Sequence, residues 1–111
     1  MPFIRAGDLV AKELLPGWRA GFFHSDHMTF SYTEVEAGAA VHRHHHPEEE
    51  VWHVIEGSVE FVLGDETRQV GAGDAVVVPS EVPHSAHALT RFRAIVVDHP
   101  VREMVAGVST R

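Results

Sequence analysis

Four histidines lie within a five-residue stretch in the first half of the chain: His42, His44, His45 and His46. A carboxylate, Glu50, follows four residues after the last of them. Neutral imidazole nitrogen and carboxylate oxygen are ligands that several divalent transition metals share. These residue types and their spacing therefore predict one divalent metal ion per chain, and they leave its identity open between nickel, zinc, iron, manganese and copper.

The histidines are expected to lie on a β-strand, because the run 51–55 that follows them is rich in β-type residues. In a strand, side chains two residues apart point to the same face, so His44 and His46 can hold one ion together. A turn at Pro47 then allows the next strand to begin with Glu50 beside them.

A second segment, residues 73–84, ends in a further histidine. Together the two segments resemble the paired motifs of the cupin superfamily. The first motif, G-x5-H-x-H-x3-E-x6-G, is matched at every fixed position, by Gly38, His44, His46, Glu50 and Gly57. The second, G-x5-P-x-G-x2-H-x3-N, is matched by Gly73, Pro79 and His84, while Glu81 and Ala88 replace its inner glycine and its asparagine.

The resemblance covers about residues 28–100 and implies an all-β cupin fold, the double-stranded β-helix or jelly-roll barrel. It also implies the metal ligands, which are His44, His46, Glu50 and His84. Four protein ligands leave two adjacent positions open on an octahedral ion, which is typical of working metal sites. A metal-free barrel is the alternative, and the cost of burying four such polar groups without an ion disfavours it.

Periodicity on its own predicts an all-β chain of about eight or more short strands, with Gly, Pro and Asp at the joints. One of these strands covers residues 28–34, where Met28, Phe30 and Tyr32 alternate with small polar residues. Tyr32 is expected to belong to the core, on the apolar face that it shares with Phe30.

His42 lies two residues before His44 and so on the same face of the predicted strand. It is interpreted as a substrate-contacting residue, a fifth ligand or a solvated histidine at the rim. His45 and Arg43 should point away from the ion by the same alternation. No residue can be named as a catalytic acid or base from the sequence.

The 111 residues predict one domain, with a preamble at 1–17, a barrel at about 18–100 and a tail at 101–111. Within the preamble, Asp8 is expected to cap a short helical turn over 9–15, which Pro16 and Gly17 end. The chain has no cysteine, which fits a reducing cytoplasm, and this is the expected location.

Composition excludes several partner classes. The start of the chain has no apolar stretch of signal-peptide length, and no window approaches a membrane span. A net charge of −7 without a Lys- or Arg-rich stretch argues against nucleic-acid binding. A small-molecule ligand or substrate is the expected partner, and the cupin resemblance adds a homodimer.

The end of the chain carries a P-x-R segment at Pro100 and Arg102. It resembles the ending of small single-domain cupins, among them enzymes that rearrange unsaturated uronic sugars. In that group an acidic residue stands four positions before the proline, where this chain has Val96, and the nearest acid is Asp98. Arg102 is interpreted either as a contact for an anionic substrate or, the favoured reading, as an exposed arginine in the tail.

Two function classes follow. The first is a metal-dependent enzyme acting on a small oxygen-rich molecule, of dioxygenase, isomerase, cyclase or lyase type. The alternative is a non-catalytic module that binds or senses a small ligand beside a metal in the barrel. A purely structural barrel is disfavoured, because the metal ligand set is complete.

Overall fold

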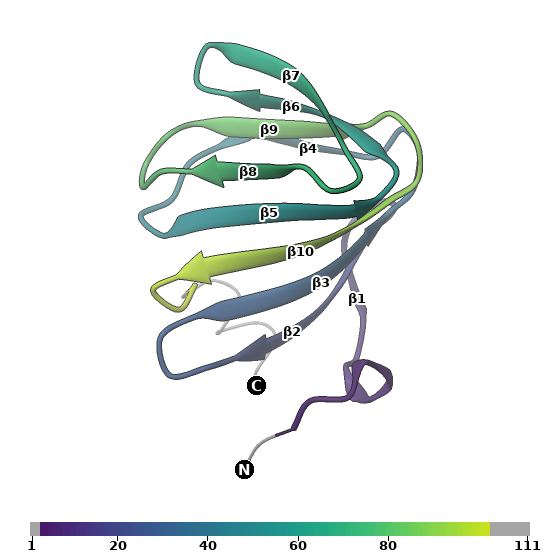
Figure 1. Cartoon of the computed structure of the whole chain (residues 1–111), viewed down its shortest axis with the longest axis vertical. Helices are drawn as coiled ribbons and strands as arrows, with labels where there is room; N and C mark the ends of the chain where they lie inside the picture. Colours follow the sequence, from purple (N-terminus) through teal and green to yellow (C-terminus); the bar gives the residue numbers. More distant parts are fainter. Residues whose placement is uncertain (1–2, 103–111) are drawn as a thin grey trace.

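The computed structural model of the chain describes residues 3–102, and it consists almost wholly of β-strands (Figure 1). A short 3-10 helix, η1, covers Ala6–Asp8. The ten strands are β1 (Lys12–Leu15), β2 (Trp18–His24), β3 (Thr29–Val35), β4 (Ala40–His44), β5 (Glu49–Glu56), β6 (Ser58–Leu63), β7 (Glu66–Gly71), β8 (Ala75–Val78), β9 (His84–Ala88) and β10 (Phe92–His99). The predicted tail, residues 101–111, lies outside the described residues apart from its first two.

The strands form two antiparallel sheets. One has six strands in the order β1-β2-β3-β10-β5-β8, and the other has four in the order β4-β9-β6-β7. Strands distant in sequence are neighbours in both sheets, since β10 lies between β3 and β5 and β9 lies between β4 and β6 (Figure 1). This arrangement confirms the predicted all-β barrel of the jelly-roll type.

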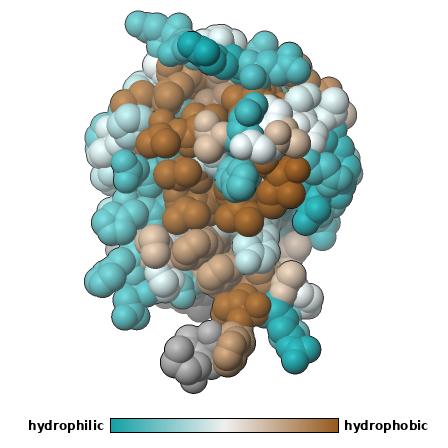
Figure 2. All heavy atoms as spheres, in the orientation of Figure 1, coloured by the Kyte–Doolittle hydropathy of each residue, from teal (hydrophilic) through white to brown (hydrophobic). Residues whose placement is uncertain are grey.

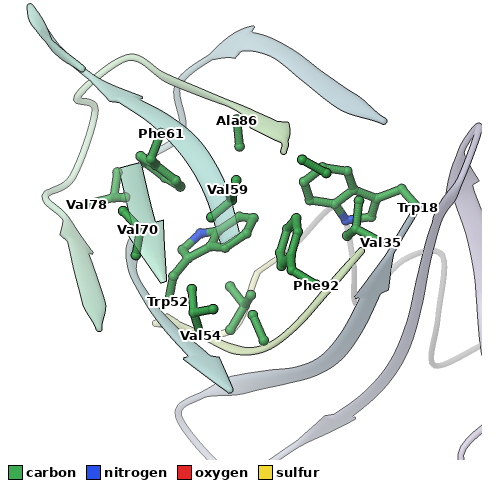
Figure 3. Close-up of a cluster of buried hydrophobic side chains, with 13 residues drawn as sticks. Trp18, Val35, Trp52, Val54, Val59, Phe61, Val70, Val78, Ala86 and Phe92 are labelled. Atoms are coloured by element: carbon green, nitrogen blue, oxygen red, sulfur yellow. The ribbon is translucent and has the colours of Figure 1, made fainter. Parts of the chain in front are cut away.

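The core lies between the two sheets. Its aromatic members pack edge to face, with ring centroids 5.9 Å apart for Trp18 and Trp52 and 6.0 Å apart for Trp18 and Phe92 (Figure 3). Trp52 also contacts Phe61 on β6, at 5.2 Å between centroids. Because these rings come from both sheets, their contacts hold the sheets face to face.

Strand β3 has the predicted alternation but the opposite orientation. Its small polar residues Thr29, Ser31 and Thr33 are buried, whereas Tyr32 is 40% exposed. The prediction that Tyr32 belongs to the core is therefore wrong. The inner face can be polar because Ser31 and Thr33 hydrogen-bond to each other and Thr29 bonds to His24, so no hydroxyl needs water.

The N-terminal segment contains no helix over 9–15, so that prediction is also wrong. Residues 12–15 form strand β1, which pairs with β2 in a hairpin where Leu15 lies opposite Trp18. Pro16 and Gly17 make the hairpin turn, and Gly17 has a φ of 75° that suits glycine. The same two residues that end a helix in one context thus reverse a strand in this one.

No helix among residues 3–102 is long and apolar enough to cross a membrane.

Candidate metal centre

Two strand pairs bring the predicted ligands to one end of the barrel. In the four-stranded sheet, His44 at the end of β4 lies opposite His84 at the start of β9. In the six-stranded sheet, Glu50 near the start of β5 lies opposite Asp98 near the end of β10, on the left in Figure 1. His46 lies in the connection between β4 and β5. The structure therefore brings together all four predicted ligands, and it adds Asp98.

The imidazoles form a tight group. Ligand atoms of His44, His46 and His84 lie within 4.8 Å of one another, and the His44 and His84 ring centroids are 4.3 Å apart. Glu50 lies against two of them: its Oε2 is 3.7 Å from His46 Nε2, and its Oε1 is 3.3 Å from His84 Nε2. His46, Glu50 and Asp98 make a second group of the same compactness.

Backbone carbonyls fix the tautomer of the three histidines. Each ring donates its Nδ1–H to a carbonyl two residues away in sequence. The accepting carbonyls belong to His42, Glu48 and Val82, at 2.8, 3.0 and 2.9 Å respectively. Because a carbonyl oxygen can only accept, Nδ1 carries a proton, and in a neutral ring the Nε2 lone pair is then free. This is the arrangement that metal-bound histidines use.

Several buried atoms at this point have no partner among the described residues. They include His46 Nε2, His84 Nε2 and Asp98 Oδ1. An unsatisfied buried polar atom costs about 1–3 kcal/mol, so three of them in one place need an explanation. Lone pairs of imidazole nitrogen and carboxylate oxygen are what a divalent transition metal binds, and the donor set therefore fits such an ion.

Burial and neighbouring charge set the ionisation of the ligands. Burial lowers the pKa of both His44 and His46, and the Arg102 charge lowers that of His46 further, which favours the neutral metal-binding form. Burial opposes the ionisation of Glu50. A polar contact with the His84 ring, hydrogen bonds from Asp98 and Trp52, and the Arg102 charge nevertheless lower the Glu50 pKa to about 2. Glu50 is therefore a carboxylate at neutral pH.

Asp98 has the opposite tendency. Burial, the Glu50 charge and a hydrogen bond to Glu50 raise its pKa to about 8, although the Arg102 charge works against this. Two carboxyl groups thus share this corner of the barrel, and one of them carries a proton at neutral pH. Burial alternates along β10, where Phe92, Ala94, Val96 and Asp98 are all buried, so Asp98 lies on the inner face of that strand.

Arg102 belongs to the site, and the favoured prediction of an exposed tail arginine is wrong. Its side chain is only 14% exposed, and its Nη1 lies 3.1 Å from Glu50 Oε2 and 3.9 Å from Asp98 Oδ2. Its backbone N–H donates to Thr29 Oγ1 at 2.9 Å. The chain thus turns back after β10 and places a guanidinium group beside both carboxyl groups, a long-range contact that no local pattern reports.

The remaining histidines of the cluster point elsewhere. His42 is exposed at the rim, 5.8 Å from His44 between ring centroids, and its carbonyl orients that ring. His45 is exposed and contacts Glu81, with 2.8 Å between Nδ1 and Oε1. The alternation that separates His45 from His44 and His46 is therefore observed.

Trp52 connects the site to the core, a contact that the sequence did not reveal. Its indole Nε1–H donates to Glu50 Oε1 at 2.8 Å. On the other side of the site, the Phe61 ring lies parallel to that of His84, with 6.2 Å between centroids. Two core aromatics thus hold two predicted ligands in position.

A sequence model of the cupin domain matches residues 31–100 of this chain, which contain both motifs. The chain belongs to the cupin family. Its fold is that of a small single-domain cupin: KdgF from Halomonas sp. superimposes with a TM-score of 0.89 at 24% identity, covering 95% of this chain and 98% of that one. A likeness at this identity establishes the fold.

Two enzymes are also similar to the chain. Dimethylsulfoniopropionate lyase DddQ from Ruegeria pomeroyi is 35% identical over 79 residues, which are 69% of this chain and 39% of the lyase. The chain thus spans well under half of that relative. Oxalate decarboxylase from Bacillus subtilis, whose centres hold Mn(II), superimposes with a TM-score of 0.76 at 25% identity, over 85% of this chain and 28% of the decarboxylase. Relatives of this cupin therefore include metal-dependent enzymes.

Proposed function

We propose that this cupin binds one divalent transition metal ion at His44, His46, Glu50 and His84 and is a metal-dependent enzyme for a small, oxygen-rich anion. The observation that carries the proposal is the convergence of imidazole nitrogens whose lone pairs are free and whose Nδ1 protons are already engaged. An ion bound there would supply Lewis acidity and would polarise an oxygen of the substrate.

Charge supports an anionic substrate. With three neutral imidazoles and the Glu50 carboxylate, a divalent ion leaves the site with one net positive charge. Arg102 adds a second positive charge through its guanidinium group. A guanidinium group binds carboxylates through paired hydrogen bonds, so Arg102 would hold the acidic end of a substrate. By their names, the lyase relative acts on a propionate and the decarboxylase on oxalate, and both are carboxylates.

The other residues around the site have separate tasks. Trp52 holds Glu50 Oε1 and so fixes the orientation of that carboxylate. Asp98 lies beside Glu50, with ligand atoms of Asp98, Glu50 and His46 within 4.8 Å of one another, so it adds a further oxygen donor to the site. His42 stands at the rim, where it can contact the part of the substrate that projects from the barrel.

Metal analysis of untagged protein tests this proposal first. We expect about one equivalent of metal in the parent and its loss in His44→Ala and His84→Ala. His87→Ala is the matched control, because His87 is exposed on the same strand as His84. The loaded protein is then screened for turnover of small carboxylates, and Arg102→Gln should lose most of any activity while keeping the metal.

Two results would contradict the proposal. A parent protein that is metal-free and also refuses added metal would remove the site. A lasting stoichiometric complex with a carboxylate, formed without product, would assign the protein to the ligand-binding class instead.

A further inference from the structure

Asp98 lies beside two of the predicted metal ligands, in a compact group with His46 and Glu50. It lies directly opposite Glu50 in the pairing of β10 with β5, so both side chains project from adjacent strands into the same end of the barrel. The residue is 2% exposed. Its carboxyl oxygen lies within 4.8 Å of ligand atoms of both His46 and Glu50, which is a separation that ligands of one ion can have.

The contacts of Asp98 leave one of its oxygens without a partner. Oδ2 is 3.9 Å from Arg102 Nη1, which is too long for a hydrogen bond. Oδ1 is buried and has no hydrogen-bond partner among the described residues. The same is true of His46 Nε2 and His84 Nε2. These three unsatisfied atoms come from β10, from the β4–β5 connection and from β9. Because they belong to three different segments, a local distortion of one strand does not explain them, whereas a ligand bound by all three would.

We propose that Asp98 is a fifth protein ligand of the metal ion, bound through the oxygen that is otherwise unsatisfied. The proposal rests on the metal site proposed above. A site with Glu50 and Asp98 both ionised cancels the charge of a divalent ion. Arg102, which lies beside both carboxyl groups, then supplies the single positive charge that remains.

This assignment changes what the ion can bind. With five protein ligands an octahedral ion keeps one open position instead of two. A substrate would then contact the metal through a single oxygen while Arg102 holds its anionic end. Chemistry that needs a chelating substrate, or a substrate and dioxygen side by side on the metal, requires two positions. The assignment therefore favours lyase, isomerase or cyclase chemistry over dioxygenation.

Counting water molecules on bound Mn²⁺ tests the proposal without reference to activity. Mn²⁺ favours six oxygen and nitrogen ligands, and pulsed EPR in isotopically labelled water detects the waters bound to it. We expect one exchangeable water in the substrate-free parent and two in Asp98→Ala. The affinity for Mn²⁺ should fall about tenfold or more in Asp98→Ala and also in Asp98→Asn, which keeps the side-chain shape.

Glu49→Gln is the matched control, because Glu49 is exposed on the same strand as Glu50 and its loss removes one nearby carboxylate from the opposite face. It should leave both the water count and the affinity unchanged. Equal water counts in the parent and Asp98→Ala, with unchanged affinity in both Asp98 variants, would overturn the fifth ligand and leave the metal site intact. A parent that binds no Mn²⁺ or other divalent metal would instead overturn the proposed function.

Discussion

Glu50 joins the candidate metal centre to the rest of the molecule. One of its oxygens accepts a hydrogen bond from Trp52 in the core, and the other lies 3.1 Å from the Arg102 guanidinium group. A carboxylate held from both sides loses little rotamer freedom when an ion arrives, so binding has a smaller entropic cost than it would have at a free side chain. The core and the site are therefore energetically connected through one residue.

Asp98 gives the metal-free protein a distinct pH dependence. Its pKa is about 8 in the folded state and near 3.8 in an unfolded chain, so the folded state binds an additional proton between these values. Stability should therefore fall as the pH rises from about 6.5 to about 8, by at most about 1.4 kcal/mol per pH unit. The lowered pKa values of His44 and His46 affect stability only below about pH 6.5, and the lowered pKa of Glu50 affects it only below about pH 4.5.

Urea unfolding in the presence of a chelator measures this dependence. The parent should lose stability across this pH range, and Asp98→Asn, which cannot titrate, should lose much less. Identical slopes for the two proteins would mean that Asp98 is already ionised at neutral pH without a metal.

At the scale of the strands, the two glycines of the first cupin motif are required for different structural reasons. Gly57, between β5 and β6, has a φ of 83°, and a Cβ there would lie 2.1 Å from the Arg91 carbonyl oxygen and 2.8 Å from the Phe92 Cα. Gly38, before β4, has a φ of 86° but would place its Cβ in open space. Gly57 is needed both for its backbone conformation and because a side chain there has no space, whereas Gly38 is needed for its conformation alone.

Substituting alanine at each position separates these two effects. Gly38→Ala should cost about 1–2 kcal/mol of unfolding free energy, the penalty for a left-handed residue with a side chain. Gly57→Ala should cost about 4 kcal/mol or more, because β5 and β6 must also move away from β10. Chemical denaturation of both variants provides the measurement, and equal losses would show that the barrel relaxes around Gly57 at no cost.

The cupin motifs were sufficient to place His44, His46, Glu50 and His84 together, because a motif records both the spacing and the strand pairing of the fold. Alternation identified the strand that contains Tyr32 but not its inner face, since inward orientation depends on which partners lie across the barrel. The sequence predicts a helix end at Pro16 and Gly17 where the structure has a hairpin turn, because helix ends and hairpin turns use the same residue types. The burial of Arg102 could not be predicted, and an exposed tail arginine was favoured, because its contacts connect β3, β5 and β10.

At the scale of the whole molecule, one outer surface is unusually apolar. Figure 2 shows apolar side chains gathered over β8, β5 and β10, and the exposed residues there include Ile55 at 42% and Val77 at 53%. Tyr32 on β3 and Ile95 on β10 line a shallow depression of about 420 Å³ on the same sheet. Apolar surface of this kind favours contact with another protein surface over contact with water.

We expect this face of the six-stranded sheet to form the homodimer that the cupin resemblance implies. Size-exclusion chromatography with light scattering should give twice the chain mass for the parent. Ile55→Glu should shift the protein toward a monomer, because it places a charge in the apolar surface. Gln69→Glu adds the same charge to the exposed strand β7 of the other sheet and should leave the mass unchanged. A monomeric parent at micromolar concentration would contradict the prediction.

The position of Arg102 affects how the protein should be handled. This residue contacts Glu50 soon after the last strand, β10, has ended. Nine extended residues span about 30 Å, so a polyhistidine purification tag fused within that distance after Arg102 would begin within reach of the proposed metal site. Such a tag carries the same imidazole ligands as the proposed site and would compete for the ion that the assay is meant to count. Metal stoichiometry is therefore best measured after any such tag has been removed.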